Sequence, residues 1–418
     1  MKTIFLLVLF SLAIKNADAQ TSYLLKADRV FDGVIMHDQW VVLVSGEQIE
    51  AIGPVGKIKV GVSTKIIELK GQTLLPGLIE GHSHVLLHPY NETSWDDQVL
   101  KESRVERTVR ATSHLQKTLM AGFTTIRDLG TEGAGYDDVG LKQSIEKGLI
   151  SGPRMLVAGP AIVATGSYGP KSNVTAIKLI NGAEEADDQN IVKVVRDQIG
   201  HGVDMVKIYA DYGWGINDSI QPTFLEEEIR KAVLTAKSSG RGVVAHASSV
   251  EGMRRAILAG VETIEHGDNG TLEIFKLMKE KNVAFCPTLA AGDAVLQYKG
   301  WKKGTEPEPQ RIIEKRASFK LALKAEVTIC MGGDVGVFSH GDNAKEMEMM
   351  VDYGMKPIDV LRSATSVNAD VFHIAKQVGR IKTNLIADLI AVNGNPAENM
   401  SAIRQVTMVI KSGKIVKE

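Results

Sequence analysis

The arrangement of apolar and polar positions divides the chain into a β-rich start, a mixed middle and a β-rich end. From residue 23 to about residue 75, and again after residue 380, short alternating stretches such as 24–30 and 387–392 are separated by Gly, Pro and Asp-Gly turns, which is typical of β-strands. Two β-rich ends that flank a different middle predict one small β-sandwich domain built from both termini, comprising residues 20–75 and 380–418.

The middle of the chain, residues 76–379, alternates short apolar runs with amphipathic stretches. Helical periodicity over 224–238 and 252–259 separates some of the runs. The eight runs are the segment that ends at His82-Ser83-His84, then 123–128, 155–158, 205–208, 243–246, 263–266, 283–288 and 328–334. Eight strand–helix units predict the α/β class and a catalytic (β/α)8 TIM barrel, in which chemistry lies at the C-terminal ends of the strands.

The first 19 residues have the pattern of a secretory signal peptide. Lys2 supplies the positive charge, residues 4–14 are apolar, and Ala17-Asp18-Ala19 provides small residues for cleavage. The apolar run is shorter than the roughly 20 residues that span a bilayer. We therefore expect export to the periplasm or the medium and a mature chain that starts near Gln20, with a retained anchor or a buried helix as the alternatives.

Composition narrows the class of partner. The formal net charge is −1, and 44% hydrophobic with 24% charged residues is ordinary for a soluble globular enzyme. A nearly neutral chain gives no reason to expect nucleic acid or an anionic membrane surface as a partner. A small-molecule substrate fits this composition better.

Four histidines and one aspartate occupy the ends of predicted strands: His82, His84, His246, His266 and Asp334. A single histidine at such a position is more often structural, but five such residues converging on one barrel mouth indicate a shared site. Residues two apart on a strand face the same side, so the first two imidazoles can reach one ion. Zinc accepts nitrogen and oxygen ligands, and catalytic zinc sites leave one position open for water.

These motifs make the chain similar to the amidohydrolase superfamily over nearly all of its mature length. The stretch Pro76-Gly-Leu-Ile-Glu-Gly-His-Ser-His84 resembles the family's first-strand signature, and residues 379–382 with 387–390 resemble its return into the small β-domain. Residues 206–209 and 340–343 resemble, more narrowly, the metal-dependent dipeptidases and imidazolonepropionase-like proteins.

The resemblance implies a two-metal site with divalent ions, of which zinc is the expected one. By position, His82 and His84 hold one ion together with Asp334, while His246 and His266 hold the second. Lys207 would be carboxylated and bridge both ions, because a carbamate offers two anionic oxygens; the alternative is an ordinary lysine at a strand end. Two such ions activate a water for attack on a carbonyl. Asp334 would take the proton of that water and pass it to the leaving amine.

Substrate recognition is predicted from loops that follow the strands. The candidates for binding a substrate carboxylate are His88, Tyr168, Tyr209, Tyr212 and His340, each with loop packing as the alternative. The closest dipeptidases are expected to have a tyrosine where this chain has Ser248, and a glycine-rich run where it has residues 209–212. These departures favour a bulky aromatic moiety, as in amidases that release phenylalanine.

The leading hypothesis is hydrolysis of the amide bond of a dipeptide or N-acyl amino acid with a free carboxylate. A second hypothesis is hydrolysis of a cyclic amide or lactone, and a third is a non-catalytic binding protein on the same scaffold. All six expected ligand positions carry residues that can bind a metal ion, which argues against the non-catalytic binding protein. Such sites take Zn, Mn, Co or Fe according to availability. Barrels of this type commonly associate, so a homo-oligomer is open.

Overall fold

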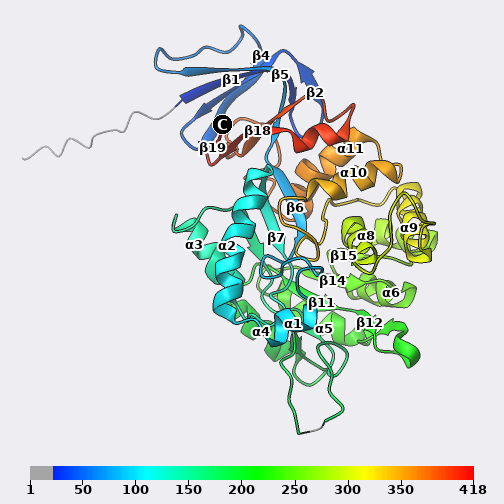
Figure 1. The fold of residues 1–418 in the computed structure, drawn as a ribbon. Coiled ribbons are helices and arrows are strands. Elements are labelled where there is room, and N and C mark those ends of the chain that lie inside the picture. Colours follow the sequence, from blue (N-terminus) through cyan, green and yellow to red (C-terminus); the bar gives the residue numbers. More distant parts are fainter. Residues whose placement is uncertain (1–21, 175) are drawn as a thin grey trace, which may run out of the picture.

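The computed structural model describes residues 22–174 and 176–418, so the predicted signal peptide lies outside the described residues. Figure 1 shows the first and last strands side by side at one end of the molecule, while the middle of the chain forms the larger body beneath them. Within the described part of the chain, no helix combines the length and the apolar character needed to cross a membrane.

The β-rich ends form one sheet. Strand β5 joins the two ends, since it pairs in parallel with β1 and antiparallel with β17. The order is β19-β18-β17-β5-β1-β3-β4, with β2 beside β1. The bounds are β1 (Ser22–Phe31), β2 (Met36–Asp38), β3 (Trp40–Ser45), β4 (Gln48–Pro54), β5 (Lys65–Pro76), β17 (Leu389–Asn393), β18 (Val406–Lys411) and β19 (Lys414–Lys417).

A single apolar cluster lies against this sheet. Ile49 on β4 and Ile410 on β18 lie near opposite ends of the strand order, yet both belong to the same buried cluster. The sheet therefore bends over one core. The predicted β-domain from both termini is present, but hydrogen bonding joins its strands into one continuous sheet where a sandwich of two was expected.

The middle of the chain contains parallel strands in two runs, β6-β7-β8 and β9-β11-β14-β15-β16. Isolated parallel bridges, Phe285–Ile329 and Ser83–Val335, place residues 329–335 between β16 and β6. We call these strands and this segment the strand ring. The bounds are β6 (Leu78–Ser83), β7 (Phe123–Asp128), β8 (Arg154–Val157), β9 (Ile162–Val163), β11 (Val206–Tyr209), β14 (Val243–Ala247), β15 (Thr263–His266) and β16 (Ala284–Cys286).

Predicted and observed strands agree closely. β7 and β15 have the predicted bounds, and most others differ by one or two residues at an end. The predicted strand over 328–334 is reduced to two bridges with irregular backbone between them. A Cβ on Gly332 would lie 2.8 Å from the backbone nitrogen of His82, so this segment approaches β6 too closely for a side chain.

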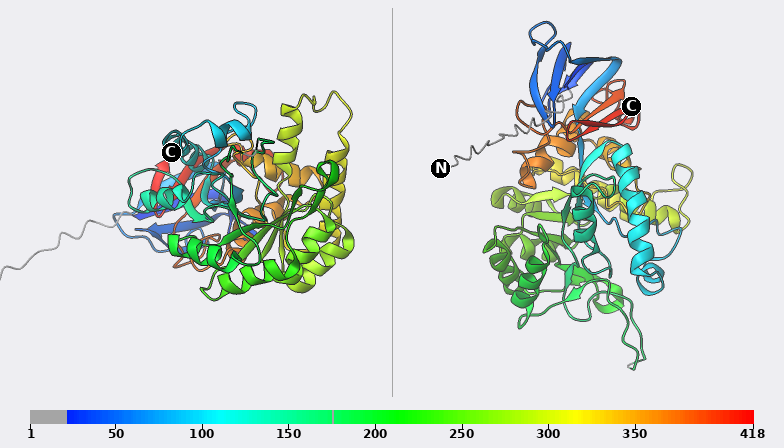
Figure 2. Two further views of the ribbon diagram at one scale, coloured as in Figure 1. Left: turned by 90° about the horizontal axis from the view of Figure 1, so that it is seen from below. Right: turned by 90° about the vertical axis from the view of Figure 1, so that its left-hand side faces the viewer.

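Helices cover the outside of the strand ring, as the left view of Figure 2 shows. Ser249 begins α6 by accepting a hydrogen bond from the Gly252 N–H, and Gly260 ends it at φ +95°. The helices are α1 (Trp95–Leu100), α2 (Arg104–Met120), α3 (Asp137–Glu146), α4 (Ile191–His201), α5 (Glu226–Lys237), α6 (Val250–Ala259), α7 (Leu272–Lys281), α8 (Leu289–Tyr298), α9 (Gln310–Ala325), α10 (Ala344–Asp352), α11 (Pro357–Arg362) and α12 (Asn368–Val371).

Shorter elements complete the loops: β10 (Glu184–Glu185), β12 (Asp211–Gly213), β13 (Ile220–Pro222), η1 (Ile216–Asp218), η2 (Ser363–Val367) and η3 (Met400–Arg404).

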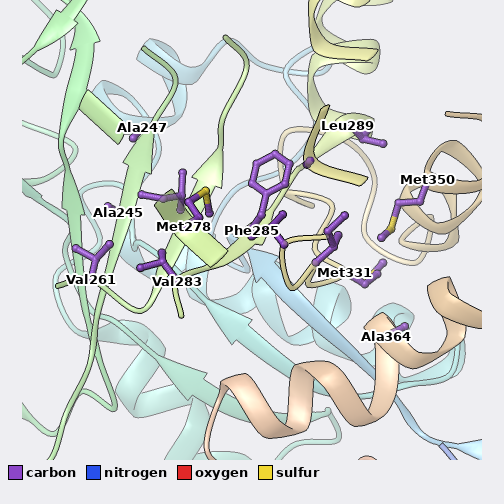
Figure 3. Close-up of a cluster of buried hydrophobic side chains, with 14 of the residues drawn as sticks. Ala245, Ala247, Val261, Met278, Val283, Phe285, Leu289, Met331, Met350 and Ala364 are labelled. Atoms are coloured by element: carbon purple, nitrogen blue, oxygen red, sulfur yellow. The ribbon is translucent and has the colours of Figure 1, made fainter. Parts of the chain in front are cut away.

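The main hydrophobic core fills the space between the strands and the helices. In Figure 3, Val283 and Phe285 from the β16 region lie beside Met278 of α7, and Met331 extends from the segment 329–335. This packing fixes the ends of the strands, where the candidate site lies.

Candidate metal centre

The four predicted histidines and Asp334 come together in the structure. The ring centroids of His82 and His266 are 5.1 Å apart, and those of His246 and His266 are 4.4 Å apart. Asp334 Oδ1 lies 3.3 Å from His84 Nε2 and 3.7 Å from His82 Nε2. These side chains come from β14, β15, the end of β6 and the segment before Val335, and they meet at one point. This agrees with the expectation that functional residues of such a fold lie at the C-terminal ends of its strands.

Lys207 lies on β11 with its side chain fully buried. Its Nζ has no hydrogen-bond partner among the described residues, and Asp334 Oδ1 also lacks one. Burial lowers the pKa of Lys207, which favours the neutral amine. Buried polar atoms without partners are rare in folded proteins, so these two atoms point to a group that the protein chain itself does not supply.

The residues present fit a divalent metal ion. Ligand atoms of His82, His266 and Asp334 lie within 4.8 Å of one another. Burial lowers the pKa of His82 to about 4 and that of His246 to about 3, so both imidazoles are neutral near pH 7, as metal ligation requires. Burial would raise the pKa of Asp334, but the interactions with His82 and His84 lower it to about 2, so the carboxylate is ionised.

Hydrogen bonds at Nδ1 orient three of the rings. His84 Nδ1 lies 2.9 Å from the Gly130 carbonyl oxygen, and His266 Nδ1 lies 2.8 Å from Thr288 Oγ1. His82 Nδ1 lies 2.8 Å from Glu265 Oε2. A partner at one ring nitrogen fixes the tautomer and leaves the other nitrogen for an ion.

Glu265 is a functional candidate that the sequence analysis missed. Its carboxylate is fully buried and also accepts a hydrogen bond of 2.7 Å from Arg127 Nη2. Burial would raise the pKa of Glu265, but the Arg127 guanidinium and the His82 bond hold it well below its usual range. The available signal was its place immediately before His266 on a strand, which gave no indication of its distant partners.

Replacing Glu265 with glutamine is expected to weaken metal binding by about 10- to 100-fold, since partners of ligating histidines contribute that much to affinity. The measurement is competition with a chromophoric chelator. Glu262→Gln is the matched control, because this residue lies just before β15 and contacts the largely exposed His373. Unchanged affinity in the Glu265 variant would show that this carboxylate does not support the centre.

A pocket of about 300 Å³ opens onto the metal-ligand candidates. Its lining includes His84, His246, His266 and Asp334. The structure places three of the predicted substrate-binding residues on the same wall, and these are Tyr168, Tyr209 and Tyr212. Cavities of this size hold small ligands, so the geometry suits a small substrate directly above the metal candidates.

His88 and His340, the other two predicted substrate-binding residues, are not among the residues that line this pocket. The ring nitrogens of His88 lie 3.0 Å from Glu92 and 2.9 Å from Glu102. The His340 ring stacks on His114 with a centroid distance of 4.2 Å, and its Nε2 lies 3.0 Å from the Leu87 carbonyl oxygen. Both rings are buried and make contacts within the protein, which agrees with loop packing, the alternative that the sequence analysis left open for these residues.

A basic group on the pocket wall was also missed. Arg311 and Lys315 lie one turn apart on α9 and both line the pocket. Lys315 Nζ donates a 2.6 Å hydrogen bond to the His266 carbonyl oxygen and contacts Asp268, while Arg311 donates at 3.2 Å to Asp268 Oδ2. Two cations share one carboxylate, so this side of the pocket retains a positive charge suited to an anionic group.

Four non-glycine residues with left-handed backbone line the pocket. Glu132, His266, Thr288 and Asp334 adopt φ values of +48°, +75°, +48° and +62° and all line it. Non-glycine residues in the left-handed region carry a conformational cost, and they cluster at functional sites. The placement of four such residues around one cavity agrees with the positions of the metal candidates.

Comparison with known proteins defines the class of protein: a hydrolase that acts on C–N bonds. The sequence profile of the Amidohydrolase family matches residues 73–416. Because the match covers more than half of the sequence, the chain belongs to the Amidohydrolase family, whose members generally bind metal ions.

Relatives of known sequence and structure support this assignment. Ochratoxinase of Aspergillus niger is 28% identical over 381 residues, which covers 82% of this chain and 75% of that protein. A Xaa-Pro dipeptidase with methionine bound in its active site has a TM-score of 0.82 at 30% identity, covering 95% of this chain and all of the other. A prolidase in complex with N-methylphosphonate-L-proline has a TM-score of 0.82 at 27% identity, with 95% and 100% coverage.

Proposed function

We propose that the chain is a metal-dependent hydrolase that cleaves the amide bond of a dipeptide or N-acyl amino acid with a free carboxylate. The observation that carries this proposal is the group of four histidines around two buried atoms, Lys207 Nζ and Asp334 Oδ1, which have no hydrogen-bond partner among the described residues. We also infer that the strand ring is a (β/α)8 barrel, since its pairings return to β6.

In this proposal His82, His84 and Asp334 hold one ion, and His246 and His266 hold the other. Two divalent ions, with zinc as the proposed metal, would supply an activated water and polarise the scissile carbonyl. Lys207 would supply two anionic oxygens to the ions once its neutral amine has added to CO₂, which forms an N-carboxylate and releases one proton. The support for this modification is the burial of Nζ near Asp334, where it has no hydrogen-bond partner within the described part of the chain.

Asp334 moves the proton in the proposed reaction. Its carboxylate is ionised and lines the pocket, so it can accept a proton from the attacking water. Delivery of the same proton to the leaving nitrogen allows the C–N bond to break and releases a neutral amine. The left-handed backbone at Asp334 holds the side chain in this position.

The basic group on α9 is proposed to bind the substrate carboxylate. Arg311 has an exposed side chain with one bond to Asp268, so its remaining N–H groups are available for a bidentate contact. Tyr168, Tyr209 and Tyr212, which line the same pocket, would provide apolar surface for an aromatic or cyclic side chain. Relatives named ochratoxinase and Xaa-Pro dipeptidase agree with a substrate of this general kind.

A substrate panel tests the proposal. Alanyl-phenylalanine and N-propionyl-phenylalanine are compared with the same compounds carrying a C-terminal carboxamide, and with cyclic amides and lactones. Loss of the charged hydrogen bonds to Arg311 is expected to lower kcat/KM by roughly 10- to 100-fold for the carboxamides. Hydrolysis of the cyclic compounds alone would contradict the proposal.

A further inference from the structure

One part of the pocket wall is built from aromatic rings around one carboxylate. The centroid of Tyr168 lies 4.9 Å from that of Tyr209 and 4.9 Å from that of Tyr212, and Trp95 meets Tyr168 edge-on at 5.2 Å. Glu132, in the loop after β7, lies beside these rings and lines the pocket.

Glu132 has one satisfied oxygen and one unsatisfied oxygen. Its Oε2 accepts hydrogen bonds from the Tyr168 hydroxyl at 2.7 Å and from Trp95 Nε1 at 3.0 Å. Its Oε1 accepts no hydrogen bond from the described residues, and its only ion-pair distance there is 3.8 Å to His84 Nδ1, which already lies 2.9 Å from the Gly130 carbonyl oxygen. No lysine or arginine of the described residues forms an ion pair with this carboxylate.

The obvious neighbouring cation does not fill this role. The Arg107 guanidinium donates to the backbone carbonyl oxygens of Thr131 and Glu132, not to the Glu132 carboxylate. The Glu132 side chain is only 2% exposed, and its backbone is held at φ +48°. Glu132 thus places on the pocket wall a carboxylate whose Oε1 accepts no hydrogen bond from the described residues. A carboxylate oxygen left free on a pocket wall, on strained backbone, points to a cationic ligand group.

We propose that Glu132 and the tyrosine wall form a subsite for the ammonium group of the substrate, the free N-terminus of a dipeptide. Glu132 Oε1 would accept a charge-assisted hydrogen bond, and the tyrosine faces would attract the cation through their quadrupoles. This inference rests on the proposed function and narrows it, because it favours dipeptides over neutral N-acyl amino acids.

The subsite gives the pocket groups of opposite charge. Arg311 and Lys315 from α9, Glu132 with the tyrosines, and the metal-ligand candidates all line the same cavity. A dipeptide carries an ammonium on the acyl side of its amide bond and a carboxylate on the amine side. Engagement of both ends would fix the direction in which the bond lies across the metal candidates.

The test uses two substrates that differ only in the ammonium, alanyl-phenylalanine and N-propionyl-phenylalanine. The wild-type enzyme is expected to favour the former by about tenfold or more in kcat/KM, the usual effect of a charge-assisted hydrogen bond. Glu132→Gln retains an acceptor for Tyr168 and Trp95, and should reduce this ratio to near one. Glu146→Gln, on the exposed end of α3, removes the same charge elsewhere and should leave the ratio unchanged.

The pH dependence provides a readout without any mutation. The preference should fall as the pH rises through the pKa of the substrate amine, about 8. Titrations of enzyme groups that act equally on both substrates cancel in the ratio. If Glu132→Gln does not fold, Tyr212→Leu replaces it, because loss of this partly exposed ring should also lower the ratio.

Equal rates on both substrates in the wild type, a preference for the propionyl compound, or an unchanged ratio in Glu132→Gln would overturn the subsite and leave the proposed function standing. Failure of the wild type to hydrolyse either compound would overturn the proposed function and the subsite together.

Discussion

Replacing Asp334 with asparagine is expected to lower kcat by about a hundred- to ten-thousand-fold, the range that general acid–base catalysis contributes. Asparagine keeps one oxygen at the position that faces His82 and His84, but it cannot accept and return a proton. Metal content should therefore remain largely unchanged while turnover is lost. Steady-state kinetics on an N-acyl phenylalanine, combined with metal analysis of the same sample, measures both quantities.

Asp352→Asn is the matched control, because this residue lies at the exposed end of α10. Near-normal turnover in Asp334→Asn would show that Asp334 does not transfer the proton. Loss of turnover together with loss of metal would assign it to metal binding alone.

Replacing Lys207 with alanine is expected to abolish detectable hydrolysis, because the two anionic oxygens of the proposed bridge are lost. The vacated space is fully buried and lies beside Asp334 and Tyr209, so a small carboxylate can replace the missing oxygens. Added acetate or propionate should then restore part of the activity. Lys207→Arg should stay inactive, since a guanidinium is protonated and does not add to CO₂.

Lys299→Ala, an exposed position just after α8, controls for removal of a lysine. Full activity of Lys207→Ala without any added carboxylate would contradict the bridge. Mass spectrometry of the native wild-type protein under CO₂ gives an independent check, because the carbamate adds the mass of CO₂ to the chain.

The metal-ligand candidates were predictable because the sequence places each of them at the end of an apolar run. His82 and His84 face one way because side chains on a strand alternate, and parallel strands bring His246 and His266 to the same edge. The bounds of β7 and β15 were also predictable, since buried parallel strands read as continuous apolar runs.

What the sequence did not reveal depends on contacts between distant segments. Glu265 meets His82 across 183 positions, and Glu132 meets Tyr168 across 36. Arg311 follows a charged stretch that reads as a surface loop, and only the packing of α9 places it beside the pocket. His88 and His340 were expected to bind substrate, but they do not line the pocket. Their position in loops does not reveal that a ring nitrogen is already hydrogen-bonded within the protein.

The central claim is that hydrolysis depends on metal ions held by the histidine–lysine–aspartate group. The most direct test is titration of chelator-treated protein with zinc while hydrolysis of alanyl-phenylalanine is followed. The account predicts no hydrolysis in the metal-free protein and a rise that reaches its plateau at about two ions per chain. Full hydrolysis by the metal-free protein would contradict it.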